Sequence, residues 1–144
     1  MQPFSGVKVL DLTHVLAGPF CTYQLSVMGA DVIKIEPPKE PDMVRPAGGV
    51  AAFNKEGLGT SFLAQNANKR AITLDITTPK VQAILKRLAA TADVLVENYR
   101  AGAMAKLGLG YEDLSKLNPR LIYCSMTGFG QTGPKGGQTA YDNV

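Results

Sequence analysis

Apolar positions in this chain form short runs, some continuous or alternating as in strands and some spaced as in helices. Residues 7–12 form a β-branched and apolar run that predicts a strand. Pro19 is well placed as the first residue of a helix over 20–28, and Gly29 then fits as its C-terminal cap. Residues 30–36 alternate apolar and polar positions until two prolines end the run, which predicts a second strand. The chain therefore opens with a predicted β-α-β unit.

Residues 37–68 contain proline, glycine and scattered apolar residues with weak periodicity. We expect a long connection there, with one short helix around residues 58–65. Long connections in compact domains are often functional.

The second half of the chain repeats the alternation. A strand is predicted over 71–76, and Thr78 and Pro79 then supply an N-cap and a first helical residue. Apolar residues at helical spacing give the following helix one apolar stripe. The remaining predicted elements are a strand over 93–96, helices over 101–107 and 111–117, and a strand over 121–126. This order predicts an α/β fold, a Rossmann-like open and mostly parallel sheet with flanking helices.

Composition places the chain among ordinary globular proteins. Apolar residues make up 45% and charged residues 19% of the 144 residues, so we expect one domain, or a piece of one, with a buried core. The net charge of +3 comes without a run of basic residues, which gives no support for nucleic-acid binding. We find neither a membrane span nor a signal peptide, so a cytoplasmic location is expected. Cys21 and Cys124 lie in apolar segments and are interpreted as free, buried, structural cysteines.

Ligands of an open parallel sheet bind where its strands end, which directs attention to the loops after residues 12, 76, 96 and 126. The first loop, residues 13–19, holds a glycine at a helix start, where backbone N–H groups could bind a phosphate or a carbonyl oxygen. A plain strand-to-helix turn explains it equally well. His14 is the only histidine, and a lone histidine is more often a hydrogen-bonded structural residue than a base, because a base needs a partner.

The loop after residue 126 matches the G-x-G-x-x-G pattern at residues 128–133. That pattern normally opens a helix in the first β-α turn and is followed by an acidic residue about 20 positions later. Here further prolines and glycines prolong the loop instead, so we reject a dinucleotide site. The sequence contains no metal-ligand cluster, and we expect no metal. The residues by themselves thus predict an anion-binding α/β domain.

Several segments taken together resemble family III CoA-transferases, the family that includes formyl-CoA transferase. The resemblance runs in order through essentially the whole chain. The segments that carry it are residues 9–19, 29–36, 68–70 with 74–75, 92–99, 117–120 and 128–134.

This resemblance implies that the chain is the N-terminal part of a Rossmann-like, CoA-binding large domain, with the small domain and the C-terminal part absent. It implies coenzyme A, as acyl-CoA, and a small carboxylic acid as partners, and an interlocked homodimer for the full-length form. Pro37 and Thr77 depart from the basic residues that relatives often carry there. The residues that the resemblance places near CoA are His14, Val15, Ala17, Leu74, Asp75, Ile76, Thr77, Asn98, Tyr99, Arg100 and Lys106.

The family's chemistry is covalent catalysis by an aspartate that attacks the acyl-CoA thioester. The resemblance puts this aspartate beyond Val144, so no catalytic residue is expected in the chain, and Asp142 is interpreted as orienting the backbone. Related α-methylacyl-CoA racemases carry a histidine where this chain has Tyr141, a phenol with an ordinary pKa of about 10 and a poor base. A racemase, or a fragment that only binds CoA, remains an alternative to the transferase.

Overall fold

A parallel sheet of five strands forms the centre of the computed structural model, which describes residues 2–140. The strand order is β3-β2-β1-β4-β5, and every pair of neighbours is parallel. Parallel neighbours need crossovers, which the intervening helices supply. The strands are β1 (Lys8–Leu12), β2 (Asp31–Glu36), β3 (Arg70–Thr73), β4 (Val94–Glu97) and β5 (Ile122–Ser125).

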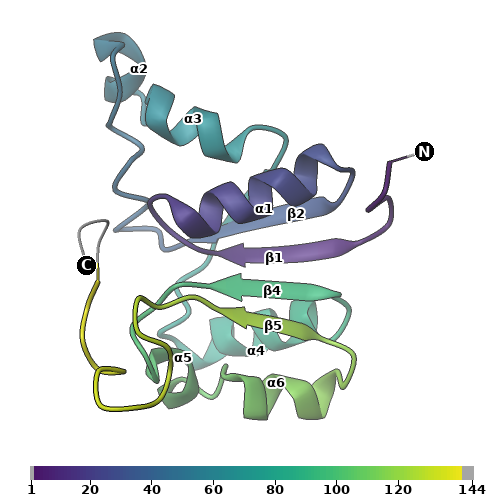
Figure 1. Cartoon of the computed structure of the whole chain (residues 1–144). Helices are drawn as coiled ribbons and strands as arrows, with labels where there is room; N and C mark the ends of the chain where they lie inside the picture. The colour runs from purple at the N-terminus through teal and green to yellow at the C-terminus, as the bar shows by residue number, and fades with distance from the viewer. Residues whose placement is uncertain (1, 141–144) are drawn as a thin grey trace.

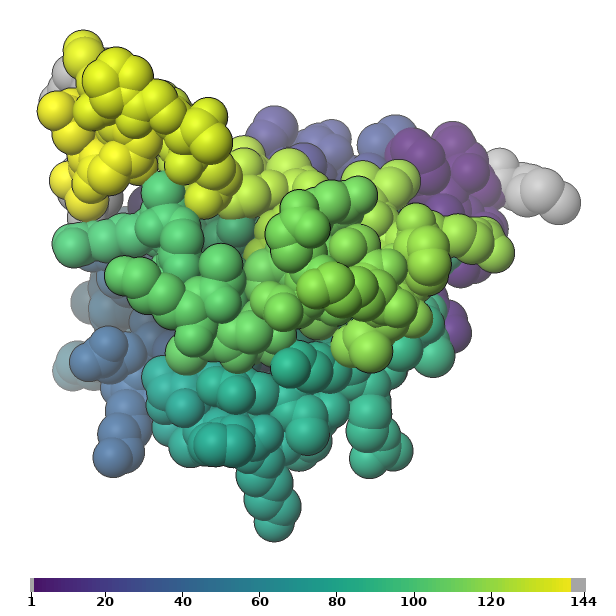
Figure 2. All heavy atoms as spheres, turned by 90° about the horizontal axis from the view of Figure 1, so that it is seen from below, coloured from purple at the N-terminus to yellow at the C-terminus, as the bar shows by residue number. Residues whose placement is uncertain are grey.

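Helices lie on both faces of the sheet, as Figure 1 shows. One face carries α1, with α3 beside it and α2 further out, and the other carries α4, α5 and α6. Figure 2 shows the second face from below, with α4 to α6 spread across it and the last described residues projecting at one corner. Within residues 2–140, no helix has the length and apolar character needed to cross a bilayer. The helices are α1 (Ala17–Val27), α2 (Ala51–Lys55), α3 (Thr60–Asn66), α4 (Pro79–Ala89), α5 (Ala103–Lys106) and α6 (Tyr111–Leu117).

The core has two parts because the central strands are covered on both faces. On β1, Leu10 and Leu12 face the α4 side and pack with Leu85 and Leu95, whereas Val9 faces the α1 side. All five side chains are at most 3% exposed. Strands that are buried on both faces are expected to be apolar at successive positions, as residues 9–12 are apart from one aspartate.

The predicted fold class is confirmed, and several element boundaries are wrong by one to three residues. The strand predicted over 71–76 is β3, which ends at Thr73 because its partner β2 ends at Glu36. Asp75 then starts a turn, accepting a hydrogen bond from the Thr77 amide. Pro19 is not the first helical residue, because the Phe20 amide donates to the Leu16 carbonyl and the helix already begins at Ala17.

The long connection is more structured than its sequence predicts. The helix expected over 58–65 is present as α3, shifted by about two residues at its start, and α2 was missed because its five residues hold no periodic pattern. The prediction that both cysteines are buried is wrong for Cys21, which is exposed on α1, while Cys124 is half-buried. Both thiols are free, as predicted.

Candidate functional site

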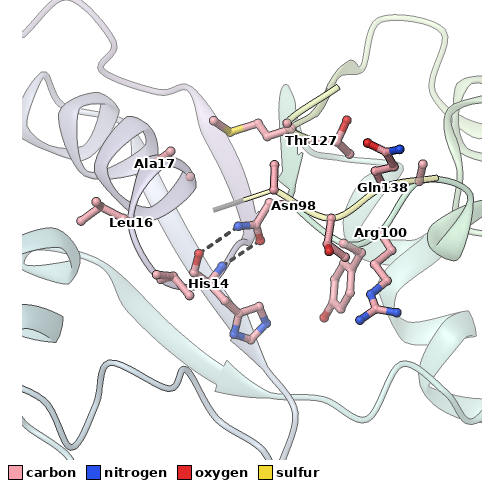
Figure 3. A pocket seen from close by; sticks show the side chains of 15 residues that line it. His14, Leu16, Ala17, Asn98, Arg100, Thr127 and Gln138 are labelled. Atoms are coloured by element: carbon pink, nitrogen blue, oxygen red, sulfur yellow. Dashed lines mark hydrogen bonds between the residues drawn. The ribbon is translucent and has the colours of Figure 1, made fainter. Parts of the chain in front are cut away.

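The chain order reverses between β1 and β4. From β1 the chain builds outward through β2 to β3, and it then returns to the other side of β1 for β4 and β5. Loops that leave such a switch point diverge, and the space between them is the usual ligand site of an open α/β sheet. A cavity of about 480 Å³ lies there (Figure 3). Its lining comes from residues 14–18 after β1, 98–101 after β4, 126–128 after β5, and 138–140.

His14 and Asn98 join the two loops at the switch point. The Asn98 carboxamide accepts a hydrogen bond from the His14 amide and donates one to the His14 carbonyl, both at 2.9 Å. Figure 3 shows this reciprocal pair, with Arg100 and Gln138 across the cavity from Leu16 and Ala17. One side chain therefore fixes the separation of the loops that follow β1 and β4.

A buried ion pair lies beneath the first loop. Asp11, on β1, and Lys69, just before β3, meet at 2.9 Å, and their side chains are 0% and 1% exposed. The Asp11 carboxylate also accepts hydrogen bonds from the Thr13 amide and from the hydroxyls of Thr13 and Thr22. Burial favours a raised pKa for Asp11, but the nearby charges of Lys69 and Lys34 and the donor hydroxyl outweigh it and the pKa is lowered. Asp11 is therefore a carboxylate at neutral pH.

His14 lies in the loop after β1, three residues beyond Asp11. Burial lowers its pKa, and the charge of Lys34 lowers it further against the raising effect of Asp42. The ring meets Tyr99 edge-on, with the ring centroids 5.9 Å apart. A neutral imidazole beside the cavity can donate one hydrogen bond to a ligand or accept one from it, without adding charge.

Glu97 links the loops on the other side of the switch point. Its carboxylate accepts hydrogen bonds from the Tyr99 amide at 2.8 Å and from the Ser125 hydroxyl. Gln131 donates to the same hydroxyl and accepts from the Gly102 amide at 3.1 Å. Burial raises the pKa of Glu97, and its hydrogen bonds only partly offset that effect. This chain of contacts ties the glycine-rich loop to the end of β4.

The raised pKa of Glu97 gives a testable pH dependence. A carboxyl group whose pKa is higher in the folded than in the unfolded protein costs stability as pH rises from about 4.3, the unfolded value, through the folded value. We expect Glu97→Gln to lack this loss. Urea unfolding of both proteins between about pH 4 and pH 7 should show the wild type losing stability relative to the variant as pH rises. A difference that stays constant across that range would contradict the assignment.

The structure brings together only some of the residues that the sequence predicted as a CoA site. His14, Val15, Ala17, Asn98, Tyr99 and Arg100 line the cavity. Leu74, Asp75, Ile76 and Thr77 follow β3, two strands away from β1, and they do not line it. Lys106 lies exposed at the end of α5 and is also outside the lining. Tyr141 and Asp142 lie outside the described residues.

Sequence reasoning missed part of the lining and most of its support. Gln138 and Thr139 line the cavity, yet no pattern in the sequence distinguishes them from other loop residues. Asp11, Lys34 and Glu36 are buried charges within β1 and β2. Charged residues are rare in strands that are covered on both faces, so their presence was the signal that could have revealed this support. Among residues 2–140, no group of three or more metal-ligating side chains is found.

Comparisons with known proteins identify the family of this chain. The chain is 49% identical over 144 residues to mouse succinyl-CoA:glutarate CoA-transferase. The match covers 100% of this chain and 32% of the mouse protein. It is 47% identical to acetyl-CoA:oxalate CoA-transferase of Acetobacter aceti, with 99% of the chain and 36% of that protein covered. The crystal structure of a CAIB/BAIF family protein from Brucella suis superposes with a TM-score of 0.88 at 43% identity, over 99% of this chain and 38% of the other.

The chain thus spans about a third of the length of these curated relatives. The sequence pattern of CoA-transferase family III matches residues 4–144, almost the whole chain. The cavity-lining loops after β1, β4 and β5 all fall inside that match. The chain belongs to CoA-transferase family III.

Proposed function

We propose that this chain is the N-terminal, CoA-binding part of the large domain of a CoA-transferase, an enzyme that moves CoA from an acyl-CoA to a carboxylic acid. The observation that carries the proposal is the cavity at the β1/β4 switch point, lined by residues from the segments that resemble the family. Membership of CoA-transferase family III supports the same reaction class.

The start of α1 suits an acyl thioester. The first amides of an α-helix have no carbonyl within the helix to bind, and Ala17 and Gly18 at the start of α1 line the cavity. Such N–H groups, aided by the helix dipole, favour a carbonyl oxygen that gains negative charge during attack on a thioester. Arg100, exposed across the cavity, offers a cation for the anionic parts of CoA.

The proposed chemistry follows the family's covalent route. An aspartate carboxylate attacks the thioester carbonyl, which releases CoA thiolate and leaves a mixed anhydride. The thiolate attacks the aspartyl carbonyl of that anhydride, which frees the donor acid and leaves an aspartyl-CoA thioester. The acceptor carboxylate then attacks this thioester, and the same two steps run in reverse to give the new acyl-CoA. We place this aspartate beyond Val144, so the chain supplies binding and orientation.

The names of relatives suggest the substrate class. The mouse relative is named for succinyl-CoA and glutarate, and the Acetobacter relative for acetyl-CoA and oxalate. We propose a short acyl-CoA donor and a small dicarboxylic acid as acceptor. An interlocked homodimer would complete the site, and exposed apolar side chains such as Phe20 (53%) and Ile122 (63%) support such an assembly.

Calorimetric titration of the purified chain with CoA and acetyl-CoA tests the proposal. We expect saturable binding that Asn98→Ala weakens about tenfold, because two hydrogen bonds joining the β1 and β4 loops are lost. Asn118→Ala is the matched control. Its carboxamide likewise makes two hydrogen bonds to the backbone, donating to the carbonyls of Ala89 and Ala92, but it lies outside the cavity lining.

The two variants separate binding from stability. Equal loss of affinity in Asn98→Ala and Asn118→Ala would contradict the assigned site. An absence of binding by folded wild-type protein would contradict the proposal that this segment forms a CoA site without the rest of the domain.

A further inference from the structure

Val15 adopts a backbone conformation that a β-branched residue rarely takes. Its φ is +73°, in the left-handed region, where such residues are outliers. Backbone strain of this kind is unfavourable and persists only where the surroundings impose it. Val15 lies in the loop between β1 and α1 and lines the cavity. Something outside the loop must therefore hold it in place.

The Asp42 carboxylate is the group that binds the amide of the strained residue. The Val15 amide lies 3.0 Å from one Asp42 carboxylate oxygen and 3.2 Å from the other, a shared hydrogen bond to both. The same carboxylate accepts from the Val44 amide at 3.2 Å. Asp42 comes from the connection after β2 and its side chain is 0% exposed, so it reaches the loop from a fixed and dry position.

Lys34 extends this contact to the other end of the loop. Its ammonium group, 1% exposed, lies 3.3 Å from Asp42 and donates to the Thr13 carbonyl at 2.8 Å. Asp42 therefore holds the Val15 amide directly and the Thr13 carbonyl through Lys34. The pair is neutral overall, which lowers the cost of burying each charge.

A second pair holds the segment that carries Asp42. The Asp42 amide donates to Glu36 at 3.0 Å, and Glu36 also accepts two hydrogen bonds from the Arg45 guanidinium. That guanidinium lies 3.9 Å above the Phe62 ring of α3. Asp42 is thus anchored to β2 on one side and, through Arg45, to α3 on the other.

We propose that Asp42 is a positioning residue of the CoA site. It keeps Val15 in the left-handed conformation and so sets the direction in which the chain leaves β1 and enters α1. That direction places the His14 backbone and the first amides of α1 at the cavity. The effect on CoA rests on the proposed function, whereas the effect on Val15 does not.

Two variants remove the Asp42 contact in different ways. Asp42→Asn removes the charge and leaves one acceptor oxygen in place of two. Asp42→Leu combined with Lys34→Met replaces the buried pair by apolar side chains of similar size, a change that often leaves stability intact. The second variant therefore keeps the test informative where Asp42→Asn alone folds poorly. Asp93→Asn is the matched control. Asp93 accepts a hydrogen bond from the Lys8 amide at the start of β1, at the opposite end of the strands from the cavity.

Amide hydrogen exchange measured by NMR in the ligand-free chain is the first readout. We expect exchange at Val15 to accelerate at least about tenfold in both variants, with the strand amides of β1 and β4 unchanged. A merely stabilising role would accelerate all core amides together, and that result, or an unchanged Val15 rate, would overturn the proposal. Asp93→Asn should leave the Val15 rate at the wild-type value.

CoA affinity with a rescue variant is the second readout. We expect Asp42→Asn to weaken binding about tenfold, and Val15→Gly in that background to restore most of the loss, because glycine takes a positive φ without strain. Failure of the glycine to restore affinity would overturn the proposed mechanism. Absence of CoA binding by the wild-type chain would instead contradict the proposed function, and Val15 exchange would still decide whether Asp42 holds the loop.

Discussion

Replacing Lys69 by methionine is expected to lower the free energy of unfolding by about 3–5 kcal/mol, because it leaves the buried Asp11 carboxylate without its partner cation. The two side chains meet at 2.9 Å and are almost completely buried. The Lys69 ammonium also donates to the Pro19 carbonyl and to Asn66, so its loss loosens α1 and α3 together. Urea unfolding at neutral pH measures the change.

The adjacent residue supplies the control. Arg70 pairs with Asp31 on the surface, where the two side chains are 66% and 46% exposed. Exposed pairs contribute about 1 kcal/mol or less, so Arg70→Met should change the unfolding free energy by no more than that. Comparable losses in Lys69→Met and Arg70→Met would show that burial of the Asp11 pair does not matter.

A double variant tests whether the loss comes from the Asp11 charge itself. Asp11→Asn should cost less in the Lys69→Met background than in the wild type, because it removes the unpaired charge. The lowered pKa of Asp11 also determines how the stability of the protein changes with pH. The stability that this group contributes is present above its unfolded pKa of about 3.9 and is lost as pH falls through the folded value.

Gly18→Ala is expected to destabilise the protein by about 3 kcal/mol, the upper end of the usual cost of overpacking, and to abolish CoA binding. A Cβ atom at Gly18 would lie 2.4 Å from the Cβ atom of Thr13. Thr13 cannot move away, because its amide and hydroxyl both donate to buried Asp11. The start of α1 would have to shift, and the cavity with it.

Gly49→Ala is the matched control for this variant. A Cβ atom at Gly49 would meet no atom of residues 2–140 within 4 Å, and the position has no positive φ. Its effect should stay within about 0.5 kcal/mol. Thermal unfolding and CoA titration of both variants measure the two effects. An unchanged melting temperature and CoA affinity in Gly18→Ala would show that the contact with Thr13 is not constraining.

The elements of the sheet could be read from the sequence with small errors at their ends. Apolar and β-branched runs predicted all five strands, and such runs are expected most clearly in the central strands β1 and β4, which are buried on both faces. The end of β3 could not be read, because the apolar residues after Thr73 suit a strand and only the length of its neighbour β2 stops the pairing. The short helix α2 has too few residues for a periodic pattern.

The candidate site was predictable at the level of loops. The rule that ligands bind beyond the carboxyl ends of parallel strands pointed to the loops after β1, β4 and β5, which line the cavity. It also pointed to the loop after β3, which does not line it, because strand order decides which loops meet. That residues 74–77 and Lys106 take part in CoA binding stays a prediction. CoA titration of variants at these positions can test it.

The sequence by itself determined the fold class and the family, because both follow from local patterns that neighbouring residues carry. Only the tertiary structure decided which loops meet at the switch point and which charges are paired. Asp11 and Lys69 are separated by 58 positions along the chain, and Asp42 reaches Val15 across 27. No local pattern records such contacts. They arise because parallel strands bring distant segments to one edge of the sheet, where buried charges must find partners.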